Sequence, residues 1–156
     1  FKTMRTRSMK VIDMAVHKVA TITDEKNITE CAAQMRREHV GSLVVVDRNN
    51  RPIGMITDRD IAIEVVARNR DPNKVTVHEA MTAPVVTAAP TESMVVALAR
   101  MREFGIRRLP IVDEEGALIG VISNSNLVEE LSSLLDSLVR NIHSSKTREI
   151  ALRSNE

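Results

Sequence analysis

The pattern of apolar and polar residues predicts a β-α-β-β-α unit in the first half of the chain. Apolar positions at helical spacing separate short β-branched runs, and a turn sequence, Asp-Arg-Asn-Asn at 47–50, joins two of the runs into a hairpin. The predicted elements are a strand at 19–22, a helix at 28–39, hairpin strands at 43–46 and 52–57, and a helix from Asp58 through Val66.

The same pattern returns 66 residues later. Residues 19–61 align without a gap on residues 85–127, and 11 of these 43 positions are identical. The second set of predicted elements is a strand at 85–87, a helix at 94–103, strands at 109–112 and 118–123, and a helix from about Asn124. Two units of this size are marginal alone, so they are expected to share one core.

We expect four segments: an N-terminal extension at 1–8, a first repeat at 9–68, a linker with a second repeat at 69–130, and a C-terminal helix with a polar tail at 131–156. A vector-derived remnant is one interpretation of the extension. Residues 11–14 and 77–81 form equivalent lead-ins to the repeats. Met14 and Met81 lie one residue out of register, which suggests a small insertion near His17 or Lys18.

The last helix carries more apolar surface than a terminal helix needs. Two interpretations stay open: it folds back on its own domain, or it packs against a partner helix. The tail from Ser144 to Glu156 is expected to fray. The apolar positions recur at three- and four-residue spacings: Leu127, Leu131, Leu134, Leu135, Leu138, Val139 and Ile142.

The amino-acid composition argues against several classes of function. A net charge of +1 provides no general field for nucleic acid or an anionic membrane, and with only Phe1 and Phe104 as aromatic residues, base-stacking platforms are not expected. Cys31 is predicted to be a small buried residue, and the four histidines lack metal-ligand spacing. Without a signal sequence or a long apolar run, the chain is expected to be cytoplasmic, with no metal and no membrane contact.

Candidate chemistry gathers where a strand passes into a helix, in Gly54-Met-Ile-Thr-Asp-Arg-Asp60. A helix N-terminus and the Thr57 hydroxyl suit an anion, and the Asp60 carboxylate suits the vicinal diol of a ribose. Alternatively, Thr57 or Asp58 merely caps the helix.

The second repeat differs at the matching places. Ser123 and Asn126 replace Thr57 and Asp60, so the charged acceptor is lost. Conversely, Arg107 and Arg108 replace Gly41 and Ser42. Because consecutive strand residues point to opposite faces, we expect at most one of the two arginines to face a given cleft.

Together, the doubling, the Gly-x-x-Thr-x-x-Asp segment and the Arg-Arg-Leu-Pro-Ile-Val-Asp strand make the chain resemble a tandem pair of cystathionine-β-synthase (CBS) domains, a Bateman module. The resemblance implies an α+β fold of two β-α-β-β-α CBS repeats packed with pseudo-two-fold symmetry. It also implies two clefts that bind adenosyl ligands such as AMP, ADP, ATP or S-adenosylmethionine. The main site would comprise Thr57, Asp58, Asp60, Ala83, Val85, Ile106, Arg107 and Arg108, and a weaker second site His17, Val19, Val40, Gly41, Ser42, Ser123 and Asn126.

We therefore expect a regulatory module rather than an enzyme, because no nucleophile, metal set or acid–base pair accompanies the cleft. The resemblance implies a homodimer. The alternative is a ligand-independent interaction or dimerisation module that uses the C-terminal helix. Nucleic-acid binding fits the composition poorly.

Overall fold

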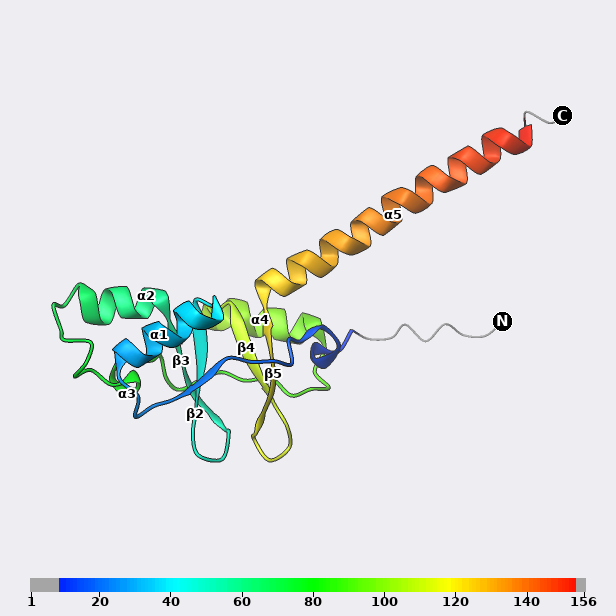
Figure 1. Ribbon diagram of the computed structural model, residues 1–156. Helices are drawn as coiled ribbons and strands as arrows, with labels where there is room; N and C mark the ends of the chain where they lie inside the picture. Colours follow the sequence, from blue (N-terminus) through cyan, green and yellow to red (C-terminus); the bar gives the residue numbers. More distant parts are fainter. Residues whose placement is uncertain (1–8, 154–156) are drawn as a thin grey trace. The chain divides into compact units, whose positions relative to one another are not determined.

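The computed structural model describes residues 9–153. It comprises two compact units, one ending at Ile122 and one beginning at Ser123. The elements in the first unit, through the last hairpin (Figure 1), are η1 (Val11–Met14), β1 (Thr21–Thr23), α1 (Ile28–Glu38), β2 (Ser42–Val46), β3 (Pro52–Thr57), α2 (Asp58–Asp60), η2 (Ile61–Val66), α3 (Val77–Ala80), α4 (Met94–Phe104), β4 (Arg108–Val112) and β5 (Leu118–Ser123, whose last residue opens the second unit).

The first repeat forms a three-stranded sheet in the order β1-β2-β3, with β1 parallel and β3 antiparallel to β2. Helix α1 begins where Asn27 and Glu30 cap each other's backbone N–H groups, and ends at His39, which has a left-handed φ of 54°. Such caps satisfy donors that a helix end would otherwise leave unpaired. The predicted strands and helices of this repeat are present, with ends shifted by one or two residues.

The helix after β3 changes its winding. Its first turn, α2, continues into the π-helical segment η2, and the N–H of Ala67 donates to the carbonyl of Ala62, five residues earlier (2.9 Å). A π-helical turn is uncommon and widens the helix locally. The predicted helix from Asp58 through Val66 is therefore present, although not as a uniform α-helix.

The second repeat has a two-stranded sheet, β4-β5, and the strand predicted at 85–87 is wrong. Instead, Ala88 makes a single bridge to Ile111, through hydrogen bonds from Ala88 N to the Pro110 carbonyl and from Val112 N to the Ala88 carbonyl. In the first repeat the Val44 N–H donates to the Ala20 carbonyl, whereas the matching residue of β4 is Pro110, which has no N–H to pair with Val86.

The two repeats exchange their lead-ins, which in the structure extend over residues 9–18 and 75–84. Val16, from the first lead-in, pairs with Val121 of β5 through two hydrogen bonds (2.9 and 3.0 Å), while Thr82, from the second, pairs with Met55 of β3 (2.8 and 3.0 Å). Each pair maps onto the other by a shift of 66 residues. Each lead-in therefore hydrogen-bonds to the hairpin of the opposite repeat.

The insertion predicted near His17 or Lys18 is wrong. The short helices η1 and α3 span 11–14 and 77–80, and both pairs of ends differ by 66. The backbone elements are therefore in register, and the two methionines are not equivalent: Met14 is the last residue of η1, whereas Met81 follows the last residue of α3.

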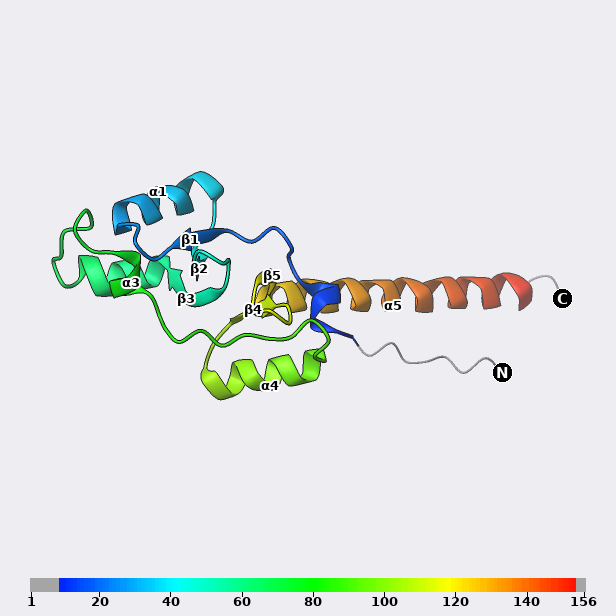
Figure 2. The same cartoon turned by 90° about the horizontal axis from the view of Figure 1, so that it is seen from below.

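The hydrophobic core is also built from both repeats. Val75, Val77 and Ala80 from the second lead-in are buried in the same cluster as Leu43, Ile56 and other apolar side chains of the first repeat. A second cluster joins Val44 and Val46 of β2 to Leu118 of β5. The hairpins β2-β3 and β4-β5 lie side by side, and α1 and α4 flank them from opposite sides (Figures 1 and 2). The predicted α+β fold of two repeats with pseudo-two-fold symmetry is confirmed, although the first strand of the second repeat is reduced to the bridge at Ala88.

Cys31 belongs to the first core cluster and is fully buried, as predicted. Burial raises the pKa of its thiol to about 11. Because only the thiolate reacts readily, this cysteine is expected to be inert in the folded chain.

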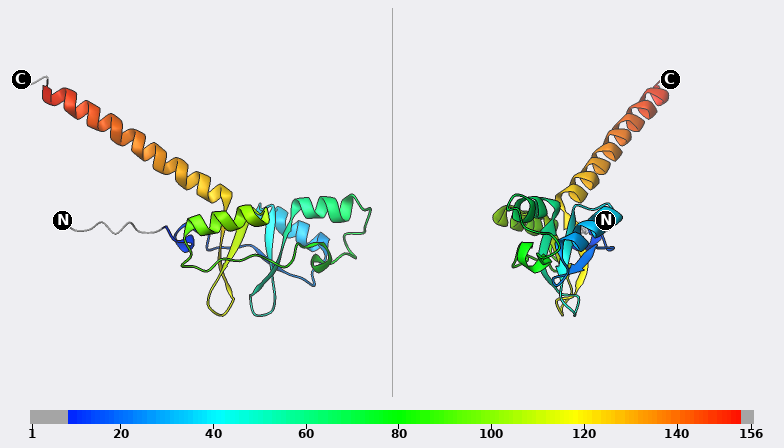
Figure 3. Two further views of the ribbon diagram at one scale, coloured as in Figure 1. Left: turned by 180° about the vertical axis from the view of Figure 1, so that it is seen from behind. Right: turned by 60° about the vertical axis from the view of Figure 1, so that its left-hand side comes forward.

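After Ser123, the described part of the second unit is one continuous helix, α5 (Asn124–Arg153), seen along its length in Figure 3. The prediction that the chain frays from Ser144 is wrong up to Arg153, because residues 144–153 contain no Gly or Pro to end the helix. Residues 1–8 and 154–156, on which the predicted extension and the end of the tail fall, lie outside the described residues. Within 9–153, no helix is both long and apolar enough to cross a membrane.

Gly54 is where the second lead-in comes closest to β3. A Cβ at this position would lie 2.6 Å from the Met81 sulfur and 3.0 Å from the Thr82 carbonyl oxygen, whereas at Gly120 the nearest atoms would be 3.3 Å away. We predict that Gly54→Ala lowers the free energy of unfolding by about 1 to 3 kcal/mol through overpacking. Gly120→Ala, the matched control, should cost less. Urea unfolding measures both, and equal stabilities of the two variants would contradict this view of the lead-in.

A pH dependence follows from the cap of α3. Glu79 accepts hydrogen bonds from the Thr76 backbone N–H (2.8 Å) and hydroxyl (3.2 Å), and it pairs with Arg70 (2.7 Å). The Thr76 N–H above all lowers the pKa of Glu79 below its usual 4.5. A carboxylate with a depressed pKa stabilises the fold above its unfolded-state pKa and loses that contribution as pH falls through the folded-state value.

We predict that Glu79→Gln shows a smaller drop in melting temperature than the wild type when pH is lowered from neutral to below 4.5. The Gln side chain keeps a capping oxygen but does not titrate. Glu103→Gln, an exposed position without an ion pair among the described residues, is the control. Identical acid profiles for Glu79→Gln and the wild type would remove this residue as a source of the pH dependence.

Candidate functional site

The candidate site is built on the N-terminus of α2. Thr57 is the N-cap: its hydroxyl accepts a hydrogen bond from the Asp60 backbone N–H (3.1 Å), and both its N–H (2.8 Å) and its hydroxyl (2.9 Å) donate to Asp60 Oδ2. The capping role considered for Thr57 is therefore present, and Asp60 is its reciprocal partner.

This cap determines which atoms are left for a ligand. Asp60 Oδ2 already accepts two hydrogen bonds, while Oδ1 accepts none from the described residues. The Thr57 hydroxyl uses its only hydrogen on Asp60. A ribose hydroxyl could therefore donate to Asp60 Oδ1 without disturbing the cap, whereas Thr57 could donate to a phosphate only by breaking it.

A cavity of about 840 Å³ lies beside this helix start. Its volume falls in the range of about 300 to 1,000 Å³ that is typical of small-molecule sites. Both repeats and the second lead-in contribute to it. The lining residues are Gly41, Met55, Thr57, Asp58, Arg59, Asp60, Thr82, Pro84, Val85, Val86, Gly105, Ile106, Arg107 and Arg108.

Of the eight residues predicted for the main site, the structure brings seven to this cavity, and only Ala83 is absent from its lining. Ala83 is exposed, between Thr82 and Pro84, which do line the cavity. The segment 82–86 thus borders the cavity, although Ala83 itself does not line it.

Both Arg107 and Arg108 line the cavity, so the prediction that at most one can face it is wrong. The alternation of side chains applies only within a strand. Strand β4 begins at Arg108, and Arg107 lies before it, in the segment that leaves α4.

Three guanidinium groups, those of Arg59, Arg107 and Arg108, belong to this cavity, and none forms an ion pair with a carboxylate within residues 9–153. Asp58 and Asp60 are the acidic residues of the lining, which leaves it with one more basic than acidic residue. The cavity therefore offers charged donors to an anion.

Several lining residues were not predicted for the main site. Gly41 was assigned to the second cleft, but it lines this one instead, because its carbonyl accepts a hydrogen bond from the Asp58 N–H (3.0 Å) and holds it next to the start of α2. Met55 and Thr82 line the cavity as a bridged pair, and no local sequence pattern predicts that these two residues pair. Arg59 could have been predicted as a site residue, since it lies inside the Gly54–Asp60 segment in which the sequence analysis placed the candidate chemistry. The remaining additions are Pro84, Val86 and Gly105.

The residues predicted for the second site fall in different units. His17, Val19, Val40 and Ser42 belong to the first unit, and Ser123 and Asn126 to the second. Ser123 and Asn126 repeat the cap of the first repeat: the Ser123 hydroxyl donates to Asn126 Oδ1 (2.6 Å) and accepts from the Asn126 N–H (3.3 Å). The amide thus keeps the cap without the charge.

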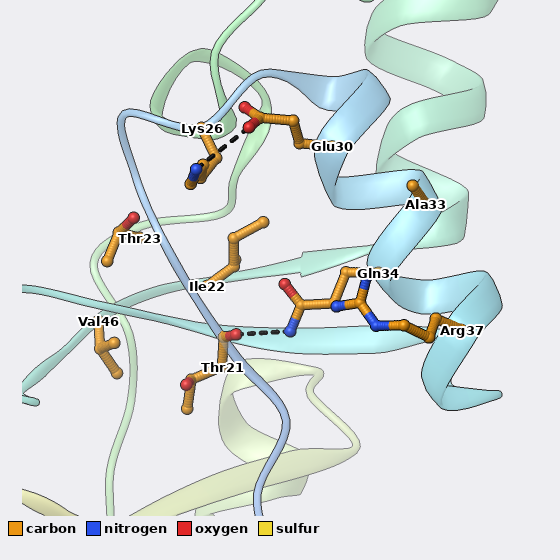
Figure 4. A pocket seen from close by; sticks show the side chains of 9 residues that line it. All are labelled: Thr21, Ile22, Thr23, Lys26, Glu30, Ala33, Gln34, Arg37 and Val46. Carbon is orange, nitrogen blue, oxygen red and sulfur yellow. Dashed lines mark hydrogen bonds and ion pairs between the residues drawn. The ribbon is translucent and has the colours of Figure 1, made fainter.

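A second cavity, of about 460 Å³, lies between β1 and α1 (Figure 4) and contains no predicted site residue. Its polar groups are largely engaged with one another: Lys26 pairs with Glu30 (3.1 Å), and Gln34 donates to the Thr21 carbonyl (2.8 Å). It is the weaker candidate, because fewer of its donors are available to a ligand. In neither cavity, nor elsewhere in residues 9–153, do three or more His, Cys, Asp or Glu side chains gather in a group that could hold a metal ion.

Comparison with known proteins identifies the class. The CBS domain profile matches the chain twice, at residues 11–67 and 77–133. The chain belongs to the CBS domain family, as a tandem pair.

Its relatives include the uncharacterized protein MK0525 of Methanopyrus kandleri, 37% identical over 123 residues, which are 79% of this chain and 63% of that protein. The CBS domain-containing protein YhcV of Bacillus subtilis is 36% identical over 124 residues, 79% of this chain and 86% of YhcV. Among solved structures, the CBS domain pair of protein MJ0100 in complex with 5′-methylthioadenosine and S-adenosyl-L-methionine superposes with a TM-score of 0.71 at 26% identity, covering 80% of this chain and 97% of that one.

Proposed function

We propose that this CBS pair is a non-catalytic regulatory module that binds an adenosyl ligand, such as AMP, ADP, ATP or S-adenosylmethionine, in the cavity beside α2. The observation that carries the proposal is the convergence of Asp60 from the first repeat with Arg107 and Arg108 from the second on one cavity of suitable volume. The complex of the MJ0100 CBS pair with adenosyl compounds supports the same ligand class.

The proposed roles follow from the chemistry of each group. Asp60 Oδ1 accepts hydrogen bonds from the ribose hydroxyls, and the arginines bind phosphate oxygens. Val85, Val86 and Ile106 provide apolar walls for the adenine. Asp58 and Thr57 hold the helix start that positions Asp60.

The charge of the lining favours a phosphate-bearing ligand. Arg59, Arg107 and Arg108 are unpaired with carboxylates of the described residues, so a nucleotide phosphate would find charged donors available. S-adenosylmethionine carries a sulfonium and an ammonium group beside its carboxylate and is a net cation, whereas the three nucleotides are anions. We therefore place AMP, ADP and ATP ahead of it.

The homodimer also belongs to this proposal. Apolar side chains of α4 and η2 are largely exposed, among them Val95 (77%), Phe104 (55%) and Val66 (70%). Exposed apolar groups on helices of a folded unit are typical of interfaces. Any regulatory effect then requires that the ligand bind two arrangements of the subunits with different affinity, because equal binding shifts no equilibrium.

The test is a calorimetric titration of the wild type and of Asp60→Asn with AMP, ADP, ATP and S-adenosylmethionine. The Asn side chain reproduces the cap seen at Asn126 but removes the charge, so it separates ligand binding from folding. We predict binding of an adenine nucleotide by the wild type and about tenfold weaker binding by Asp60→Asn, a loss of about 1.4 kcal/mol. Asp60→Ala, which loses the oxygen as well, should weaken binding by about 1 to 3 kcal/mol.

Asp13→Asn is the matched control, because it removes the same charge outside the cavity and its side chain caps no helix. Unchanged dissociation constants in both Asp60 variants would exclude this carboxylate from the site. A wild type that binds none of the four compounds would refute the proposed function.

A further inference from the structure

Helix α5 carries an apolar stripe along one face. Val128, Leu131, Leu135, Leu138 and Ile142 alternate at steps of three and four residues, which is the seam spacing of a coiled coil. Leu134 and Val139 widen the stripe on either side. All seven side chains are more than half exposed: Val128 63%, Leu131 59%, Leu134 52%, Leu135 55%, Leu138 55%, Val139 51% and Ile142 51%.

A single helix cannot cover its own stripe. The second unit begins at Ser123, and its described part is α5 alone, so this unit has no other element to pack against these side chains. Helices in water depend mainly on the packing of an apolar face for their stability. The stripe therefore calls for an apolar surface from outside the unit.

The charges of α5 indicate which surface that is. The first half, residues 124–138, contains Glu129, Glu130 and Asp136 and no basic residue, a net charge of −3. The second half, residues 139–153, contains four basic residues and one acidic residue, a net charge of +3. One ion pair within α5, Arg140 with Asp136 (3.1 Å), uses a charge from each half, and the other charges have no ion-pair partner in the described residues.

Two copies of such a helix attract each other in one orientation only. Side by side and parallel, they place acidic half against acidic half and basic against basic, whereas antiparallel they place each acidic half beside a basic one. The helix dipoles are also opposed in the antiparallel pair. The whole helix has no net charge, so an anionic membrane surface would attract its basic half but repel its acidic half.

We propose that α5 pairs with α5 of a second copy of this chain as an antiparallel two-helix coil. In an antiparallel coil the two kinds of seam position face each other, and the register of this kind nearest the middle of the stripe packs Leu135 against Leu138 of the second copy. Leu131 then meets Ile142, and Val128 lies opposite Ser145. This pairing does not depend on the proposed nucleotide binding.

Disulfide cross-linking of the full chain tests the pairing and its orientation together. Positions 128 and 145 lie 17 residues apart, about 25 Å along a helix, whereas a disulfide requires Cα atoms within about 7 Å. In the antiparallel pair, Val128→Cys alone and Ser145→Cys alone give no cross-link. A mixture of the two variants, and the double variant by itself, give a cross-linked dimer on mild oxidation.

The background should be low, because Cys31 is buried. Adding Leu135→Glu and Leu138→Glu to the double variant should abolish the cross-link. Ser133→Glu with Ser144→Glu adds the same charge on the opposite face of the helix and should leave the cross-link intact. Circular dichroism of each variant verifies that the helix persists.

Each outcome decides the proposal. Cross-linking of the Val128→Cys variant with itself would show a parallel pair and overturn the orientation. If neither the mixture nor the double variant cross-links, α5 does not form the proposed antiparallel pair, and the proposal is overturned. Loss of nucleotide binding has no bearing on either result.

Discussion

The exchange of lead-ins between the two repeats is the constraint on which the rest of the first unit depends. Two pairs of backbone hydrogen bonds, Val16 with Val121 and Thr82 with Met55, tie each repeat to the segment that precedes the other. The first repeat cannot complete its core by itself, because Val75, Val77 and Ala80 are buried among its side chains. The same crossing carries residues 82–86 past the start of α2, and so makes the cavity a property of the pair rather than of one repeat.

The two repeats share the same backbone framework, but substitutions at matching positions give them different side chains near the start of the helix that follows the hairpin. Both repeats cap the helix after the hairpin by the same scheme, with Thr57 and Asp60 in one and Ser123 and Asn126 in the other. The side-chain hydrogen bonds of the cap need an oxygen at the last position but no charge, since Asn126 makes them with Ser123. The charge on Asp60 goes beyond this requirement, and we assign it to a ligand. Arg107 and Arg108 bring guanidinium groups to the same cavity, whereas the residues at the matching positions of the first repeat, Gly41 and Ser42, are uncharged.

The elements with strong local signals could be predicted from the sequence. The hairpin around Asp47–Asn50 and the helix capped by Asn27 follow from turn residues, periodicity and capping, all encoded within a few neighbouring positions. What could not be predicted depends on distant partners. No local pattern says that Thr82 pairs with Met55, that Gly41 lies against Asp58, or that β4 starts one residue too late to turn Arg107 away from the cavity. The length of α5 was underestimated from the sequence, because the polar residues from Ser144 were expected to fray. Polar residues alone do not end a helix, and residues 144–153 contain no Gly or Pro.

The central claim is that one cavity, made by both repeats, holds an adenosine between Asp60 and the Ile106–Arg108 segment. A crystal structure of the chain grown with saturating AMP tests it most directly. The account predicts density for one adenosine per chain, with the ribose hydroxyls within hydrogen-bond distance of Asp60 Oδ1 and the phosphate next to Arg107 or Arg108. Density for the nucleotide in the cavity between β1 and α1, or an empty cavity beside α2 at saturation, would contradict it.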